Sequence, residues 1–207
     1  TNSFITGSQE DPAVASLADG GYVIVWESDV QDGSGNGVFG QRYNAEGVIV
    51  GPEFLVNGNV LGSQVDPQVT GLAGGGFVVT WTDQDSNVDG SGWGVFAQQY
   101  LADGTPQGSQ FLVNTTTSSS QYEPSVAALN DGGYLVAYRD GGNADGSADG
   151  VFAQRYDASG ATVGAEFQVN AETSSNQFDP SVAGLSDGGF VIAWTSVNSG
   201  GAGDGDG

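Results

Sequence analysis

Apolar residues gather in short, unbroken runs that return at a nearly constant spacing along the chain. The runs read YVIVW, FVVTW, YLVAY and FVIAW, and their first residues lie 55, 57 and 56 positions apart. A continuous apolar run of this length, bounded by turn residues, is typical of a strand that is buried on both faces of its sheet. Self-similarity at a fixed period indicates an array of repeated structural units. The four runs occupy residues 22–26, 77–81, 134–138 and 190–194.

Each repeat contains four predicted strands and no helical periodicity. In the first repeat, the first strand carries Val14 and Leu17 and ends at the Asp-Gly-Gly sequence of residues 19–21. This sequence favours a tight turn, because glycine adopts positive φ without steric cost. The remaining strands of this repeat are expected at residues 22–26, 38–43 and 53–57.

Four strands per repeat, with a doubly buried second strand, predict an all-β fold of propeller-like blades, each about 56 residues long. A β-solenoid or a string of small β-modules is the alternative, although this period is long for one solenoid coil. We expect the large aromatic residues that end the apolar runs to be buried equivalents, namely Trp26, Trp81, Tyr138 and Trp194. The predicted boundaries are residues 1–10 for the end of a preceding repeat, 11–65, 66–122 and 123–178 for three repeats, and 179–207 for a partial fourth.

The partial fourth repeat contains only the first two of the four predicted strands. Unpaired sheet edges are templates for pairing with another chain. We therefore expect the chain to associate with further repeats of a longer protein or with copies of itself.

The charge balance restricts the partners of this protein. There are 25 acidic residues against three basic ones, which gives a formal net charge of −22. Phosphate backbones and anionic membrane surfaces are recognised through lysine and arginine, so the sequence argues against nucleic-acid and membrane-surface binding and favours cations. No run of 18 apolar residues occurs, and membrane insertion is therefore not expected.

Composition also argues against catalysis. Histidine and cysteine are both absent, which removes the commonest general base and all thiolate chemistry. The acidic residues lie in repeated loops and not in one unique cluster. We therefore predict that the chain is not an enzyme.

The loop after the second strand is the strongest candidate for a cation site. In the second repeat, Asp85, Asn87 and Asp89 precede Gly90 and match the opening of a calcium loop, in which alternate oxygen-bearing side chains converge. Weaker versions occur in the other loops. The predicted Ca²⁺ ligands are Asp83, Asp85, Asn87 and Asp89 in the second repeat, Asn143, Asp145 and Asp149 in the third, and Asp29 and Asp32 in the first.

The same residue types also occur for reasons unrelated to calcium. Asp, Asn and Gly form loops without any ligand, and a surface rich in Asp and poor in Lys is typical of halophilic proteins. Trp93 is the one tryptophan inside a loop, where it stacks on a glycan or packs on its own turn. Arg42 and Arg155 are expected to pair with acidic side chains.

The repeated phrases resemble a known class of proteins. The DGG(F/Y)VVxW-like, GVFxQRY and EFxVN sequences are similar to tandem repeats of large secreted bacterial proteins of the RTX or adhesin type. The stretch from Asp85 to Gly90 is also similar to the calcium loops of FG-GAP propellers. The resemblance implies an extracellular, calcium-associated and adhesive or matrix-forming protein.

Together these observations predict an extracellular or cell-surface, calcium-binding β-repeat module of a bacterial adhesin or matrix protein. Two alternatives remain open at this point. One is a structural subunit of an extracellular filament, and the other is a glycan-binding propeller lectin.

Overall fold

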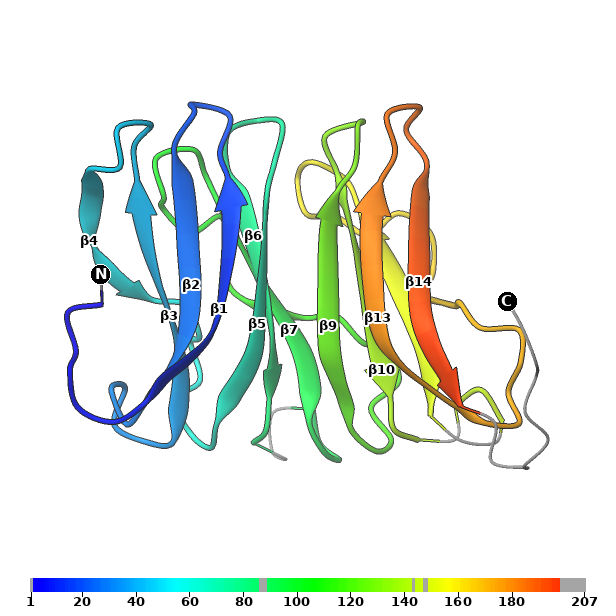
Figure 1. Ribbon diagram of the computed structural model, residues 1–207. Helices are drawn as coiled ribbons and strands as arrows, with labels where there is room; N and C mark the ends of the chain where they lie inside the picture. The colour runs from blue at the N-terminus through cyan, green and yellow to red at the C-terminus, as the bar shows by residue number, and fades with distance from the viewer. Residues whose placement is uncertain (1, 86–88, 143, 147–148, 198–207) are drawn as a thin grey trace.

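The computed structural model describes residues 2–85, 89–142, 144–146 and 149–197, and these form strands joined by turns and loops. Three sheets have four antiparallel strands each and a fourth has two, all in sequence order (Figure 1). No helix among the described residues is both long and apolar enough to cross a membrane. The strands are β1 (Gln9–Ser16), β2 (Tyr22–Asp29), β3 (Asn36–Tyr43) and β4 (Ile49–Leu55); β5 (Gln64–Gly71), β6 (Phe77–Asp83), β7 (Gly94–Tyr100) and β8 (Phe111–Leu112); β9 (Gln121–Ala128), β10 (Tyr134–Asp140), β11 (Gly150–Tyr156) and β12 (Phe167–Gln168); and β13 (Asn176–Gly184) and β14 (Phe190–Val197).

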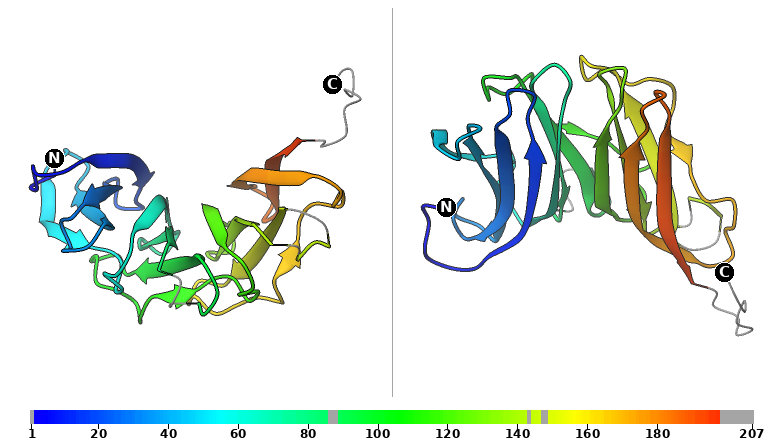
Figure 2. Two further views of the ribbon diagram at one scale, coloured as in Figure 1. Left: turned by 90° about the horizontal axis from the view of Figure 1, so that it is seen from below. Right: turned by 45° about the horizontal axis from the view of Figure 1, so that its top comes forward.

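The sheets are arranged as consecutive blades of a β-propeller, which confirms the predicted fold class. The first strand of each sheet contacts the first strand of the next, β1 with β5, β5 with β9, and β9 with β13. Seen from below, the blades fan out along an arc with these first strands on its concave side (Figure 2). The fourth strands lie outermost, and β8 and β12 are much shorter than the predicted strands.

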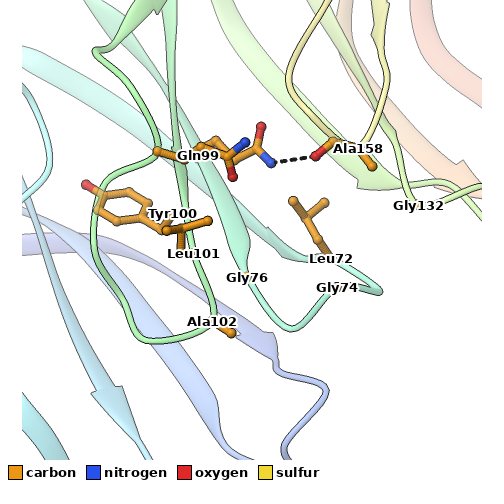
Figure 3. Close-up of a pocket in the computed structure, with 10 residues that line it drawn as sticks. Leu72, Gly74, Gly76, Gln99, Tyr100, Leu101, Ala102, Gly132 and Ala158 are labelled. Atoms are coloured by element: carbon orange, nitrogen blue, oxygen red, sulfur yellow. Dashed lines mark hydrogen bonds between the residues drawn. The ribbon is translucent and has the colours of Figure 1, made fainter.

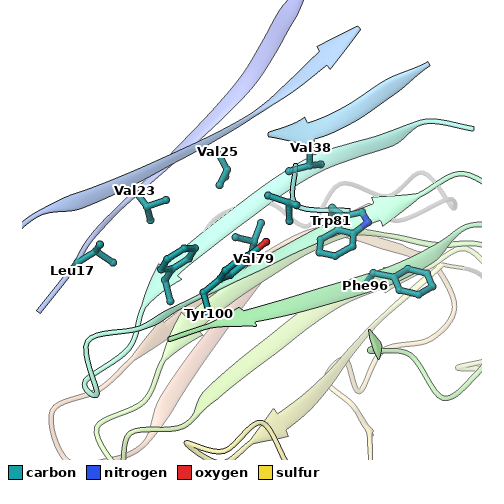
Figure 4. Close-up of a cluster of buried hydrophobic side chains, with 10 residues drawn as sticks. Leu17, Val23, Val25, Val38, Val79, Trp81, Phe96 and Tyr100 are labelled. Atoms are coloured by element: carbon teal, nitrogen blue, oxygen red, sulfur yellow. The ribbon is translucent and has the colours of Figure 1, made fainter. Parts of the chain in front are cut away.

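The core lies between neighbouring blades, because each sheet has apolar side chains on both faces. Val23 and Val25 of β2 pack against Val79 and Trp81 of β6 (Figure 4). In the same way, Val78 of β6 packs in one cluster with residues of β10, and Leu135 of β10 packs with residues of β13 and β14. A second strand that faces two neighbours is apolar at most positions, which explains the apolar runs.

A buried hydrogen-bonded relay repeats at each junction between blades. The asparagine that ends each EFxVN-like phrase accepts the backbone N–H of the third strand through its Oδ1, as Asn57 does from Val38 at 2.8 Å. Its Nδ2 donates to the glutamine that begins the next blade, as Asn57 does to Gln64 at 2.9 Å. Gln121 extends the relay to Asp140 at 2.8 Å. Buried polar bonds of this kind fix how one blade follows the next. Further members of the relay are Asn114, Asn170 and Gln177.

One expectation about the core is wrong. Trp26, Trp81 and Tyr138 are buried, but the side chain of Trp194 is 39% exposed. Each of the three buried residues lies on a second strand that pairs with a third strand, whereas β14 pairs only with β13 among the described residues. The ring of Trp81, for example, stacks on Phe96 of the neighbouring β7. Burial of this aromatic position therefore depends on the third strand of the blade as well as on the apolar run.

We predict that Trp81→Ala strongly destabilises the protein, whereas Trp93→Ala does not. The side chain of Trp81 is 0% exposed and that of Trp93 is 39% exposed. Truncating a buried tryptophan costs about 3–5 kcal/mol of unfolding free energy. Urea unfolding of both variants checks this, and a Trp81→Ala protein as stable as the Trp93→Ala control would contradict the assigned core.

Candidate functional site: the axial groove

A groove of about 300 Å³ lies on the concave side of the arc, where the first strands of three blades approach one another. It is lined by one acidic side chain and one uncharged polar side chain from each of β5, β9 and β13, together with two prolines. We call this feature the axial groove. Its polar residues are Asp66, Gln68, Glu123, Ser125, Asp179 and Ser181.

In each of these first strands, the acidic residue that lines the groove lies in a β-bulge. The register shifts at the Asp-Pro or Glu-Pro sequence, and the acidic residue has a positive φ of 55° at Asp66, 56° at Glu123 and 52° at Asp179. Positive φ is uncommon outside glycine, although Asp tolerates it. Bulges often redirect a side chain at a functional edge, and this one recurs at Asp11 with a φ of 45°.

Burial and mutual repulsion raise the pKa of carboxyl groups beside the groove. The pKa of Asp66 is raised first by burial and then by the charges of Glu123 and Asp11. The pKa of Glu27 is also raised by burial, although its carboxylate accepts the backbone N–H of Asp66 at 2.8 Å. Among the described residues, no basic side chain forms an ion pair with Asp66 or Asp179. The groove therefore carries excess negative charge.

Glu123 differs from Asp66 and Asp179 because both of its carboxylate oxygens accept hydrogen bonds from other residues of the protein. Oε1 accepts a hydrogen bond from Arg139 Nη1 at 2.9 Å, and Oε2 accepts the backbone N–H of Asp179 at 3.3 Å. Arg139 also pairs with Asp149, and its guanidinium lies 4.8 Å from the ring centre of Tyr122. These contacts hold Glu123 in one orientation at the groove.

The predicted calcium ligands of the second blade lie away from the axial groove. Asp83 is fully buried and accepts hydrogen bonds from the side-chain amides of Gln64 and Asn59. The amide of Asn59 also contacts Asp85 at 3.4 Å, so the carboxylates of Asp83 and Asp85 are neighbours. Asn87 lies outside the described residues.

Asp89 and its equivalents shape the turn before the third strand. Asp89 Oδ1 accepts the backbone N–H groups of Ser91 and Gly92, and Asp32 Oδ1 accepts that of Ser34. Asp145 accepts a hydrogen bond from Asn170, as Asp32 does from Asn57. Each of these contacts is of a kind that also forms loops without a metal.

The other predicted ligands are dispersed. Asp149 is paired with Arg139, and Asp29 lies at the end of β2. Asn143 lies outside the described residues. In the part of the chain that the structure describes, no three acidic side chains gather closely enough to hold a metal ion. The predicted calcium set stays a prediction, and within it Asp83 and Asp85 share contacts with the amide of Asn59.

Trp93 packs on a neighbouring blade while keeping part of its ring exposed. Its indole meets the ring of Tyr122 edge-on, with ring centres 5.8 Å apart. Tyr122 in turn contacts Arg139. Sequence reasoning missed the axial residues Asp66, Glu123 and Asp179, although the repeated acidic-Pro dipeptides were a visible signal.

Comparisons with known proteins support the fold. No protein-family model matches the sequence, and no curated protein matches it significantly. The structure is similar to the α-L-arabinofuranosidase of Fusarium graminearum solved with an iminosugar inhibitor, with a TM-score of 0.65, 13% identity and coverage of 96% of this chain and 59% of that one.

Two further solved structures are bacterial. The endo-arabinase of Bacteroides thetaiotaomicron matches with a TM-score of 0.54 and 16% identity, over 94% of this chain and 73% of that one. A protein of unknown function from Dyadobacter fermentans matches with a TM-score of 0.59 and 14% identity, over 93% and 63%. This chain thus spans less than two thirds of the Fusarium and Dyadobacter proteins. At these identities the similarity shows the β-propeller fold alone.

We predict that Asp66→Asn stabilises the protein at neutral pH. The folded-state pKa of Asp66 is raised above its ordinary value of 3.8, so the ionised carboxylate favours the unfolded chain. The resulting loss of unfolding free energy is absent at pH values below the ordinary pKa and fully present at pH values above the raised pKa. Asparagine tolerates the same positive φ.

Thermal unfolding at pH 7 and at decreasing pH checks this prediction. The midpoint should be higher for Asp66→Asn at pH 7, and the difference should shrink as the wild-type carboxyl becomes protonated. Asp103→Asn is the control, because Asp103 is a turn residue whose pKa is lowered, chiefly by hydrogen bonds from Thr105. A less stable Asp66→Asn protein would show that the axial charge is not a folding penalty.

Proposed function

We propose that this chain is an extracellular, non-catalytic binding module, a run of propeller blades in a bacterial surface adhesin or matrix protein, and that its axial groove binds neutral saccharide. The observation that carries the proposal is the set of carboxylate, amide and hydroxyl groups that three successive blades present to one groove. Such groups accept and donate hydrogen bonds to sugar hydroxyls. The fold is shared with carbohydrate-active enzymes.

The charge of the groove selects the class of saccharide. Asp66 and Asp179 are acidic and have no basic ion-pair partner among the described residues. Combined with a net charge of −22, they repel sialylated and uronic-acid glycans. A neutral oligosaccharide has no such penalty and supplies hydroxyl donors to both carboxylates.

The state of Glu123 supports an ordering role for this one of the three groove carboxylates, in place of a catalytic one. Hydrolysis of a glycosidic bond ordinarily needs two carboxyl groups, one to donate a proton and one to act as a base or nucleophile. Both oxygens of Glu123 already accept hydrogen bonds, from Arg139 and from the backbone of Asp179. A carboxylate held in this way serves to order the groove.

We predict that neutral oligosaccharides bind to the axial groove. The double variant Asp66→Asn/Asp179→Asn should bind them about tenfold more weakly or worse, because hydrogen bonds to charged groups are lost. Asp103→Asn/Asp157→Asn removes the same charge from two exposed turns and should bind as the wild type does. Calorimetry with neutral and anionic oligosaccharides measures both. Tighter binding of anionic glycans would refute the assigned ligand class, and release of reducing ends from arabinan would refute the non-catalytic part.

Calcium binding in the loop of the second blade is a second candidate. It is favoured by the neighbouring carboxylates of Asp83 and Asp85, which share the amide of Asn59. In a protein with a net charge of −22, a cation that binds only the folded state stabilises it, by about 2.7 kcal/mol at one hundred times the dissociation constant.

We predict that millimolar Ca²⁺ raises the unfolding temperature relative to chelator at matched ionic strength. Asp85→Asn/Asp89→Asn should lose most of the shift, and Asp66→Asn/Asp179→Asn should keep it. Equal unfolding midpoints of the wild type with and without calcium would contradict a specific calcium site. The acidic residues would then be explained by a surface of the halophilic type.

Packing against a further blade is consistent with the exposed face of the β13–β14 sheet. Val191 on the outward side of β14 is half exposed, whereas its equivalents in the preceding blades, Val23, Val78 and Leu135, are fully buried against a neighbour. A further blade, from the same protein or from another copy, fits this face by the contacts that already join the other blades.

A further inference from the structure

The face of the first blade that points away from the second blade is open. Val23 and Val25 of β2 pack against the second blade, so Ile24 between them faces the opposite way, where it is only partly buried. Val14 lies opposite Ile24 in the register of β1 and is 66% exposed. A hollow of about 160 Å³ lies beside Ile24 and Trp26. We call the surface around Val14, Ile24 and Trp26 the entry face. The equivalents of Val14 and Ile24 in later blades all pack into clusters between blades, namely Val69, Val79, Val126, Val136, Val182 and Ile192.

The relay that joins neighbouring blades is half formed at the entry face. Asn2 Nδ2 donates to Gln9 Oε1 at 2.7 Å, as Asn57 Nδ2 does to Gln64. Asn57 Oδ1 also accepts the backbone N–H of Val38 on the third strand of its own blade, whereas no described residue donates to Asn2 Oδ1. The missing partner of Asn2 is therefore the backbone N–H of a third strand. The same third-strand bond is made by Asn114 and Asn170.

A second contact from a third strand is also missing at the first blade. At the next two junctions, a side chain of the third strand reaches a turn of the following blade. Gln99 of β7 donates to the carbonyl of Ala158 at 3.0 Å (Figure 3), and Arg42 of β3 donates to that of Ala102 at 2.7 Å. Ala45 is the equivalent turn residue of the first blade, and no described side chain donates to its carbonyl. Both missing contacts thus need a third strand in front of the first blade.

The charge of the entry face favours a basic residue in the partner. At the last junction, the guanidinium of Arg139 lies 5.2 Å from the ring centre of Phe178 in the following blade. The residue equivalent to Phe178 in the first blade is Glu10, which is exposed. Glu10 lies opposite Glu27 in the register of β1 and β2, and like charges at opposite positions are destabilising. An arginine equivalent to Arg139 in a preceding blade would therefore reach Glu10.

We propose that the entry face is an interface for a complete four-stranded blade of this same repeat, joined through Asn2 in the same polypeptide and carrying an arginine at the position of Arg139. Its third strand donates a backbone N–H to Asn2 Oδ1 and a side-chain N–H to the carbonyl of Ala45. A second copy of this chain does not meet these needs, because β14 pairs only with β13 among the described residues. This interface is separate from the saccharide and calcium proposals, and its test uses neither ligand.

A variant with an added blade tests the proposal. A copy of residues 121–169 takes the place of Thr1, so that the copy ends directly before Asn2 and supplies its own third strand, Arg139 and Arg155. We expect one thermal unfolding transition with a higher midpoint than that of the 207-residue chain, because stacked repeats stabilise one another through their shared interfaces. An unchanged midpoint, or a separate transition of the added blade, would overturn the interface.

Two substitutions within the added copy determine which of its faces meets the entry face. In the original chain, Leu135 faces the following blade and Val136 faces the preceding one. Leu135→Asp in the copy should therefore abolish the increase in midpoint, whereas the matched control Val136→Asp, on the free side of the added blade, should keep most of it. The reverse result would overturn the proposed orientation.

Substitutions in the first blade test the individual contacts. Asn2→Ala should lower the midpoint of the extended protein more than that of the 207-residue chain, because only the extended protein supplies a donor to Oδ1. The increase caused by the added blade should be smaller when Glu10 is replaced in both proteins by Glu10→Gln. Equal effects of Asn2→Ala in the two proteins would overturn the assigned hydrogen bond, and an unchanged increase with Glu10→Gln would overturn the required arginine.

Sedimentation of the unextended chain tests the other possible occupant. We expect no dimer that depends on the entry face. A concentration-dependent dimer that is lost in Ile24→Asp would show that a second copy covers this face, and would overturn the proposed occupant.

Discussion

The burial of each second strand between two neighbouring blades is the constraint on which the structure depends. Val23 of β2, Val79 of β6 and Val136 of β10 are all fully buried, and each contacts side chains of an adjacent sheet. A single four-stranded sheet of this kind would expose one or both apolar faces, so a blade gains its stability from its neighbours. The exposure of Val191 on β14 shows the same dependence at a sheet that has one described neighbour.

Once the blades stack, a polar layer fixes their order and spacing. The Asn57–Gln64 and Asn114–Gln121 bonds connect the outer part of one blade to the inner strand of the next. These bonds are buried, so they contribute a specificity that apolar contacts alone do not supply. They also account for the burial of the acidic side chain of Asp83, because Gln64 donates to its carboxylate.

The repeats differ where their junctions need different chemistry. Arg42 reaches the next blade as a guanidinium, whereas its equivalent Gln99 reaches it as an amide. At the position of Glu27 and Thr82, the third blade has Arg139, which is held between aromatic rings and two carboxylates. These exchanges change local charge without changing the packing of the second strands. The axial groove, by contrast, is lined by equivalent positions of three successive blades.

The sequence by itself determined the repeat, the strands of each blade and the acidic character of the surface. Apolar runs at a constant spacing indicate double burial, because a strand that packs on both faces is apolar at nearly every position. Tertiary structure alone decided where the acidic residues meet. Asp66, Glu123 and Asp179 are separated by more than fifty residues, and the curvature of the blade array brings them to one groove. Conversely, Asp85 and Asp89 are close in sequence, yet one contacts Asn59 and the other shapes a turn. Spacing along a chain predicts local turns, but the direction of a side chain depends on the sheet that carries it.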